Sequence, residues 1–549
     1  MKRPKVKRIE FDMNELQAIV EQARSTPLSA ADHDKLKAVL STLARLTQEL
    51  ENKRTSISRL RHLLFGPRSE NSAVVLNRQG SGNSSAGAGK RNQKSNKKKR
   101  KGHGRNGASA YRGADRVEIP HESLSSGNPC PQSGCTGKVY DRSDPGVIVR
   151  IKGMPPLGGT VYELEKLRCS LCGTVFTAQA PAGVGEKKYD ETAASMVANL
   201  KYGAGFPFHR LEKLQGNLGI PMPAPTQWEI VEEAARKCEP AFDALIDEAA
   251  QGEVLHNDDT PMKILDLLAQ NHEPGQDGDG PKRTGLYTTG IISKCGTRLI
   301  ALFFTGRDHA GENLGQVLAR RARQRDAPIQ MCDALSRNLP GEFKTILGNC
   351  LAHGRRRFVD IVDNFPEPCR YILQILGEVY VNDAVTRRER MSPRERLDFH
   401  QTQSKPLMQE LHEWFECQFS QKKVEPNSGL GQAISYMLNH WQELTLFLRE
   451  PGAPLDNNIC ERALKKAILH RKNSLFYKTQ NGARVGDIFM SLIHTAELSA
   501  VDPFDYLCAL QRNTKPLAED PGQWLPWNYQ QTLAHITEGS AGDARPQAP

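Results

Sequence analysis

Three carboxylates in the second half of the chain limit the folds that it can adopt. A short apolar run ends at Asp258 and Asp259 within Val-Leu-His-Asn-Asp-Asp-Thr-Pro, and a second run ends at Asp333 within Ile-Gln-Met-Cys-Asp. The third carboxylate, Glu461, lies in residues 454–476, where the spacing of apolar residues predicts a helix with one buried face. A carboxylate on a helix that also carries basic residues is what a metal-dependent nuclease needs beside a phosphodiester.

Glu461 also has a purely structural explanation. Asn458 is a good helix N-cap, and Glu461 three residues later completes a capping-box pattern, while Lys465 lies one turn further on for an ion pair. The local pattern alone favours this explanation. The two Asp-bearing runs favour a catalytic one, because three carboxylates can hold two Mg²⁺ ions that activate a nucleophile and stabilise a leaving oxygen.

Three motifs carry a specific resemblance to a known family. They are His-Asn-Asp-Asp-Thr-Pro at residues 256–261, Cys-Leu-Ala-His-Gly-Arg-Arg-Arg-Phe at residues 350–358 and Asp-Asn-Asn-Ile-Cys-Glu-Arg at residues 456–462. In these motifs the chain resembles the insertion-sequence-66 family of bacterial DDE transposases, from about Leu36 to about Leu510. The resemblance implies an enzyme that cleaves insertion-sequence ends and transfers them to target DNA, with Mg²⁺ or Mn²⁺ as cofactor. It also implies small accessory proteins of the same element as further partners.

The family places its catalytic Asp first in an Asp-acid-Thr-Pro run. The resemblance therefore implies Asp258, Asp333 and Glu461 as catalytic residues and ligands of Mg²⁺. Asp259 should then point to the opposite side of its strand, because successive side chains of a strand alternate between its faces.

Two further features accompany the resemblance. After the second Asp the family commonly has Gly-Tyr, whereas this chain has Ala334 and Leu335. Cys350 and His353 match a family motif. They can be metal ligands, or equally a buried thiol and a hydrogen-bonded imidazole.

The predicted fold is a multidomain α/β arrangement. Residues 251–500 should form an RNase H-like catalytic domain, because three strands, a helix and a fourth strand are expected in turn at residues 254–258, 285–293, 298–304, 311–323 and 329–333. A helical insertion at 343–450, packed around Trp414 and Trp441, should separate Glu461 from the two Asp residues along the sequence. We expect the C-terminal tail, 501–549, to be loosely structured after Pro516, and we assign it no function.

Positive charge is concentrated near the N-terminus. The net charge is +11, but residues 1–110 alone carry 24 Lys and Arg against 9 Asp and Glu, so the rest of the chain is slightly acidic. Residues 71–110 form a Gly/Ser/Asn-rich basic linker that we expect to be disordered. It should grip DNA phosphates without reading bases, through Lys97, Lys98, Lys99, Arg100 and Lys101. A solvated tail is the alternative.

The N-terminal region, residues 1–70, contains a heptad pattern. Apolar residues recur every seven positions over residues 31–65, which predicts a coiled coil and hence a homodimer or higher oligomer. An amphipathic helix that packs on its own chain is the alternative. No apolar run is long enough to span a bilayer, so we expect a cytoplasmic protein without a membrane partner. The family resemblance implies that it is bacterial and nucleoid-associated.

Residues 111–185 are predicted to form a zinc ribbon. Two cysteine pairs joined by a hairpin suit a tetrahedral structural Zn²⁺ site, formed by Cys130, Cys135, Cys169 and Cys172. The alternative is four ordinary buried thiols. The first pair is spaced more widely than usual, although the family resemblance also implies a zinc domain here.

The middle of the chain, residues 186–250, reads as helical with a weak helix-turn-helix pattern. Further DNA contacts are expected from basic residues of the Glu461 helix, namely Lys465, Lys466, Arg471 and Lys472, with a solvated helix face as the alternative. A non-enzymatic DNA-binding regulator would explain the chain up to residue 250 but not the three carboxylates. A sequence-independent nuclease would share the carboxylates but show no preference for particular DNA ends.

Overall fold

The computed structural model describes residues 123–133, 135–140, 156–168, 175–183, 185, 187–270 and 284–542, with scattered positions between 19 and 39. The chain divides into two compact units, Asn83–Gly158 and the remainder. Most of the predicted coiled coil at 31–65, the whole basic linker at 71–110 with Lys97–Lys101, and the cysteines Cys169 and Cys172 lie outside the described residues. The predictions made on them stay predictions.

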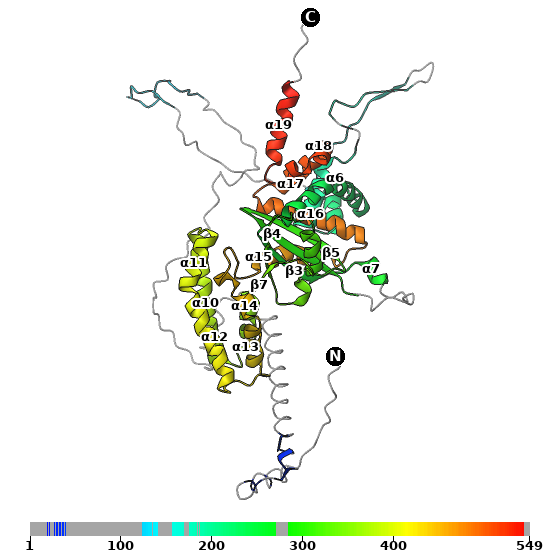
Figure 1. The fold of residues 1–549 in the computed structure, drawn as a ribbon. Coiled ribbons are helices and arrows are strands. Elements are labelled where there is room, and N and C mark those ends of the chain that lie inside the picture. Colours follow the sequence, from blue (N-terminus) through cyan, green and yellow to red (C-terminus); the bar gives the residue numbers. More distant parts are fainter. Residues whose placement is uncertain are drawn as a thin grey trace, which may run out of the picture. The chain divides into compact units, whose positions relative to one another are not determined.

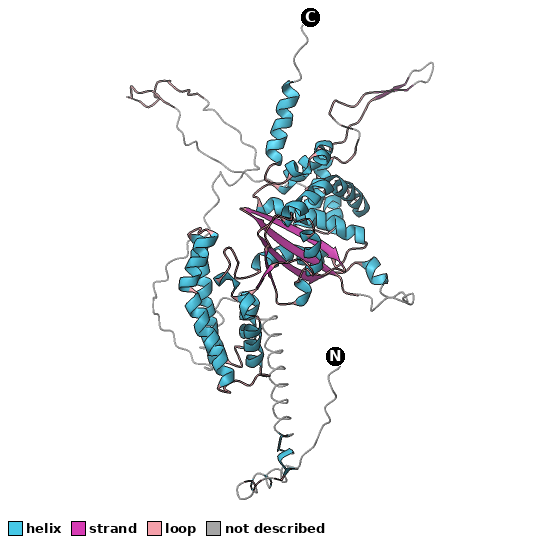
Figure 2. Ribbon diagram, in the orientation of Figure 1, coloured by secondary structure: helices cyan, strands magenta, loops and turns pink. Residues whose placement is uncertain are grey.

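A five-stranded mixed sheet forms the centre of the larger unit (Figures 1 and 2). Its strand order is β5-β4-β3-β6-β7; β3 pairs antiparallel with β4, β4 antiparallel with β5, while β6 runs parallel to both β3 and β7. The strands are β3 (Val254–Pro261), β4 (Tyr287–Cys295), β5 (Arg298–Gly306), β6 (Ile329–Cys332) and β7 (Ile346–Asn349).

The predicted order of three strands, a helix and a further strand is confirmed, with helix α8 (Ala310–Leu318) before β6. The fifth strand was not predicted. Ile346–Asn349 was counted with the helical insertion, but it forms β7 beside β6. In a four-residue edge strand the alternation of polar and apolar residues is too short to distinguish the strand from the helix that follows it.

Helices cover both faces of the sheet. Thr289 of β4 accepts a hydrogen bond from Asn313 of α8, whereas a side chain at the adjacent Gly290 would meet Leu464 of α15 (Asn458–Ser474). Since neighbouring residues of a strand face opposite sides, α8 and α15 lie on opposite faces. The long helix α6 (Ala224–Ala250) contacts α8, β4 and β5.

One edge of the sheet is β5, and helix α16 (Gln480–Leu498) covers it. Backbone N–H groups at alternate positions of β5 donate to α16 side chains one turn apart: Thr305 to Asp487, Phe303 to Ser491 and Ala301 to Thr495. An unpaired strand edge can pair with a strand of another molecule and so promote aggregation. Here the α16 side chains accept hydrogen bonds from the N–H groups of the β5 edge.

The predicted helical insertion is present after β7. It packs around a core that includes Phe358 and Phe415, with Trp414 and Trp441 against it as predicted. Its helices are α9 (Leu351–Ile361), α10 (Pro366–Arg388), α11 (Pro393–Gln403), α12 (Lys405–Ser420), α13 (Gly429–Asn439) and α14 (Trp441–Leu444).

The helical region before the sheet also agrees with prediction. It comprises α4 (Glu191–Ala198), a π-helical turn (Asn199–Gly203) and α5 (Phe208–Asn217), followed by a turn and α6. Two short strands, β1 (Lys166–Arg168) and β2 (Val175–Thr177), pair antiparallel ahead of it. DNA binding by the α5–turn–α6 pair stays a prediction.

The expectation of a loosely structured C-terminal region after Pro516 is wrong. Helices α17 (Pro503–Arg512), α18 (Thr514–Glu519) and α19 (Tyr529–Gly542) enclose a short 3₁₀ turn (Pro521–Trp524). Trp524 is buried, and its carbonyl accepts a hydrogen bond from the Tyr506 hydroxyl at 2.9 Å. The buried Trp524 side chain holds this segment in place. Because the segment is mostly polar, nothing in its sequence indicated that it packs. Within the described residues, no helix has the length and apolar character needed to cross a membrane.

Candidate active site

The first two carboxylates lie at equivalent positions on neighbouring parallel strands. β3 pairs with β6 in a register that sets His256 opposite Met331. Two residues further along each strand direction, this register brings Asp258 opposite Asp333, which directly follows the last residue of β6. Asp258, within β3, and Asp333, directly after β6, therefore lie at matching positions of two neighbouring strands.

Glu461 reaches the same place from helix α15. The helix begins at Asn458, with Asn457 at the N-cap position and no side-chain cap hydrogen bond from it. Asp456 instead accepts hydrogen bonds from the backbone and side chain of Asn458, at 3.1 and 2.7 Å. The predicted capping box between Asn458 and Glu461 is therefore wrong, and Glu461 is not needed to close the helix end.

His353, on the first turn of α9, lies between two of the carboxylates. Its Nδ1 is 2.7 Å from Asp333 Oδ1, and its Nε2 is 3.8 Å from Glu461 Oε1. Arg356, one turn along the same helix, places a guanidinium nitrogen 3.9 Å from Glu461 Oε2. Asp333, Glu461 and His353 thus converge from three separate segments of the chain.

Asn457 ties these segments together. Its side chain is fully buried, lies 3.0 Å from His256 Nδ1 and donates to the carbonyl of Asn257 at 3.1 Å. Its backbone N–H donates to Cys350 Sγ at 3.2 Å. One residue therefore connects the strand of Asp258, the start of the His353 helix and the start of the Glu461 helix. Nothing in the sequence singled out Asn457, although it belongs to the Asp-Asn-Asn motif.

Burial and charge repulsion shape the site's electrostatics. Burial, and next the charge of Asp333, raise the pKa of Asp258 to about 7. Glu461 Oε1 is buried and has no hydrogen-bond partner. Buried carboxylates that repel one another and leave an oxygen unsatisfied are suited to a divalent cation, and an all-oxygen donor set matches Mg²⁺ or Mn²⁺.

Asp259 lies on the opposite face of β3, as expected from strand alternation. Its side chain is buried, 3.0 Å from His309 Nδ1 and 3.3 Å from a guanidinium nitrogen of Arg337. His309 is the N-cap of α8, and Arg337 lies in the loop that follows Asp333. Asp259 therefore holds the loop after the second carboxylate against the strand of the first.

The predicted DNA-contacting residues of α15 divide into two groups. Lys465 and Lys472 are exposed and lie one and three turns beyond Glu461, on its stripe of the helix. Lys466 instead pairs with Glu497 at 2.7 Å, and Arg471 donates to Thr260 at 3.1 Å. The latter two are engaged by the protein itself.

The arginine run of α9 divides in the same way. Arg355 is largely buried, and Arg357 stacks over Tyr436 with its guanidinium carbon 3.8 Å from the ring centre. Arg356 lies beside a carboxylate of the site, Glu461.

The structure describes half of the predicted zinc ligands. Cys130 and Cys135 flank a turn closed by an isolated bridge between Pro129 and Lys138, and Cys135 is exposed. Their predicted partners, Cys169 and Cys172, lie in the stretch between β1 and β2 outside the described residues.

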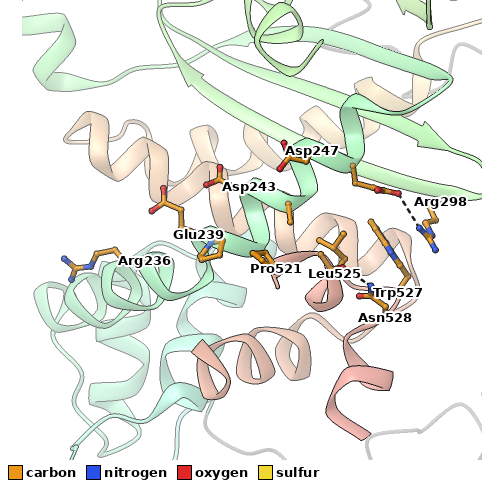
Figure 3. A pocket seen from close by; sticks show the side chains of 13 residues that line it. Arg236, Glu239, Asp243, Asp247, Arg298, Pro521, Leu525, Trp527 and Asn528 are labelled. Carbon is orange, nitrogen blue, oxygen red and sulfur yellow. Dashed lines mark hydrogen bonds and ion pairs between the residues drawn. The ribbon is translucent and has the colours of Figure 1, made fainter. Parts of the chain in front are cut away.

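A cavity of about 820 Å³ lies between α6 and the segment around Pro521 (Figure 3). Its wall includes Glu239, Asp243 and Asp247 of α6, and Arg298, whose guanidinium lies over Trp527. None of the three candidate catalytic carboxylates lines it. The three α6 carboxylates pair with arginines, Glu239 with Arg484 and both Asp243 and Asp247 with Arg320, and we assign the cavity no ligand.

Comparison with known proteins gives one family and several relatives. The family model described as "Transposase IS66 family" matches residues 187–485. The uncharacterized protein y4jD of Sinorhizobium fredii (strain NBRC 101917 / NGR234) is 27% identical over 381 residues, which cover 66% of this chain and 70% of the relative. The uncharacterized protein y4hP of the same strain is 26% identical over 396 residues, covering 67% and 68%.

Proposed function

The chain belongs to the IS66 family of transposases, and from this premise we propose that it cuts the ends of an insertion sequence and joins them to target DNA. The observation that supports the proposal is the convergence of Asp333 and Glu461 on His353, with Asp258 in register beside Asp333. These residues are far apart in the sequence, and a helical insertion separates the last from the first two.

We further propose that the sheet is the core of an RNase H-like fold. Its support is the order β5-β4-β3-β6-β7, in which three antiparallel strands are followed by two that run parallel to the first. In this arrangement β3 and β6, the first and fourth strands of the sheet along the chain, are neighbours. Their pairing accounts for the matching positions of Asp258 and Asp333.

Asp258, Asp333 and Glu461 would hold Mg²⁺ or Mn²⁺. When bound, such cations polarise the phosphodiester and generate the attacking water or 3′-hydroxyl nucleophile. The chain's own residues do the positioning: Asp258 lies within β3, Asp333 directly follows β6, and Glu461 lies on a helix fixed by Asn457. Lys465 and Lys472, exposed on the Glu461 stripe, would neutralise phosphates of the DNA strand that enters the site.

The remaining parts of the proposal concern the N-terminal regions. We propose a structural Zn²⁺ held by Cys130, Cys135, Cys169 and Cys172, and an oligomer formed through residues 31–65. The basic linker would add DNA affinity without base recognition.

Charge-removing substitutions test the catalytic proposal. Asp258→Asn, Asp333→Asn and Glu461→Gln keep the shape of each side chain but remove the charge that binds the cation. Each alone should reduce strand cleavage by several orders of magnitude while DNA binding is kept, because the carboxylates act as a unit. Cleavage and strand transfer are measured on DNA that carries the element's own ends.

Two matched variants serve as controls. Asp326→Asn changes an exposed carboxylate in the loop before β6, and Asp456→Asn leaves an oxygen to cap α15. Both should cleave like wild type. Wild-type cleavage by Glu461→Gln would refute the assignment of that residue. Cleavage without any preference for the element's ends would favour a sequence-independent nuclease, and DNA binding without cleavage by the wild type would favour a regulator.

A further inference from the structure

A second set of potential metal ligands adjoins the three carboxylates and shares one of them. It consists of Asp333, which follows β6, Cys350 at the N-cap of α9, and His353 on the first turn of α9. One ligand atom from each lies within 4.8 Å of the others. Their approach depends on the tertiary fold, since β6 and β7 must lie side by side to bring Asp333 to the start of α9.

His353 and Asp333 are already in contact. Nδ1 and Oδ1 lie 2.7 Å apart as an ion pair, and both atoms are buried. An imidazole nitrogen and a carboxylate oxygen are both metal ligands, so a cation could take the place of the proton between them.

Cys350 is placed as a thiolate ligand would be. Its side chain is fully buried, and Sγ accepts a hydrogen bond from the backbone N–H of Asn457 at 3.2 Å. A hydrogen bond that a neighbouring group makes to a metal ligand orients the ligand and tunes its basicity. The sulfur thus has a fixed direction and a hydrogen-bond donor beside it.

From this geometry we propose that Asp333, Cys350 and His353 bind a first-row transition-metal ion of the Zn²⁺ class. Sulfur, imidazole and carboxylate donors together favour such an ion over Mg²⁺, and three protein ligands leave a fourth position open. Asp333 is shared: Oδ1 faces this site, and its second carboxylate oxygen is left for the all-oxygen site. The proposal does not depend on DNA cleavage.

Cobalt substitution tests the proposal on the full-length protein. Production in cobalt-supplemented medium loads Co²⁺ during folding, and a bound thiolate gives a sulfur-to-cobalt charge-transfer absorption band. The wild type should contain one more Co²⁺ per chain than Cys350→Ser, with a stronger charge-transfer band. Cysteines of the predicted zinc ribbon contribute equally to both proteins and cancel in the comparison.

Cys369→Ser is the matched control, because Cys369 is also fully buried but packs in the apolar core of the helical insertion. It should keep the wild-type cobalt content. His353→Gln provides a second variant with a partly exposed side chain, and its Zn²⁺ affinity in a chelator competition should fall at least about tenfold. Equal cobalt content and equal charge-transfer absorption in wild type and Cys350→Ser would overturn the proposal, as would wild-type zinc affinity in His353→Gln.

The readout also separates this proposal from the catalytic one. Metal content and absorption do not involve DNA, so a protein that fails to cleave can still hold the ion. Conversely, the wild type could cleave DNA while Cys350→Ser keeps the wild-type Co²⁺ content. That result would refute the metal site and leave the three-carboxylate assignment intact.

Discussion

The carboxyl group of Asp487 lies on α16 with almost no access to solvent. Its oxygens accept hydrogen bonds from the backbone N–H of Thr305 at 2.7 Å and from the Thr305 hydroxyl at 2.6 Å. Burial nevertheless dominates and raises the pKa of Asp487 to about 8. Near neutral pH this residue therefore carries a proton in the folded protein that it lacks in the unfolded chain.

This difference predicts a pH-dependent stability. Between the ordinary Asp pKa of about 4 and about pH 8 the folded state binds the extra proton, so the free energy of unfolding falls as pH rises, by at most about 1.4 kcal/mol per unit. Asp487→Asn removes this titration, so its stability should decline less than that of wild type. Thermal or urea unfolding at pH 5 and pH 8 measures both, and identical pH profiles would contradict the prediction.

Helix α8 packs closely against the loop after Asp333. A Cβ on Gly311 would lie 2.1 Å from the carbonyl oxygen of Leu339 and 2.8 Å from that of Arg337. Both neighbours are backbone atoms, which cannot rotate away. The sequence shows only a glycine within a predicted helix, so the constraint comes from the packing of two elements.

Gly311→Ala should therefore destabilise the protein, by about 1–3 kcal/mol or more. Gly315, one turn along the same helix, is the matched control, since its Cβ would have its nearest neighbour at an ordinary 3.4 Å. Gly315→Ala should be neutral or stabilise by up to about 1 kcal/mol through helix propensity. Unfolding midpoints in urea report both changes, and equal midpoints for the two variants would argue against the close approach.

Asn457 connects three of the elements that carry the candidate site. Asn457→Ala leaves the ring of His256 and the carbonyl of Asn257 without their partner, which should destabilise the fold by about 1–3 kcal/mol. Cleavage should fall further than stability explains, because the start of α15 is no longer fixed against β3. DNA binding should change little.

Gln227→Ala is a suitable comparison for that variant. Gln227 is equally buried and donates to the carbonyls of Phe208 and Met222, away from the three carboxylates. The two variants should lose similar stability, measured by thermal unfolding, but only Asn457→Ala should lose cleavage at temperatures where both are folded. Equal cleavage by both variants would show that Asn457 contributes to stability and not to the geometry of the candidate site.

At the scale of the whole molecule, the chain separates its positive charge from its candidate catalytic residues. Residues 1–110 hold the net excess of cations, while the remainder is slightly acidic. Replacing Lys97, Lys98, Lys99, Arg100 and Lys101 with Ser should weaken binding uniformly across DNA sequences and flatten its dependence on salt, because fewer counterions are released.

Fluorescence anisotropy over a series of salt concentrations measures both effects. Replacing the uncharged stretch at 79–89 with a Gly/Ser sequence of the same length is the control, and it should leave the salt slope unchanged. An unaltered slope after the basic residues are replaced would indicate that the linker does not contact phosphates. A slope lowered for the element's ends alone would indicate a role in recognition.

Local patterns were enough to predict much of the fold. The order of strands and the α8 helix, the helical insertion and the alternation of Asp258 and Asp259 follow from apolar periodicity and strand geometry. The candidate catalytic carboxylates came from motifs and resemblance. β7 and the packed C-terminal helices were not foreseen, because a four-residue edge strand and a polar segment around Trp524 have weak local signals.

By itself, the sequence indicated which residues are candidates for the chemistry and which segments form regular structure, because both depend on residue type and on spacing along the chain. Only the tertiary structure decided which of these residues meet. It placed Cys350 and His353 beside Asp333, freed Glu461 from the helix cap, and engaged Lys466 and Arg471 within the protein. Such contacts join residues distant in sequence, so they depend on strand register and helix packing, which no local pattern encodes.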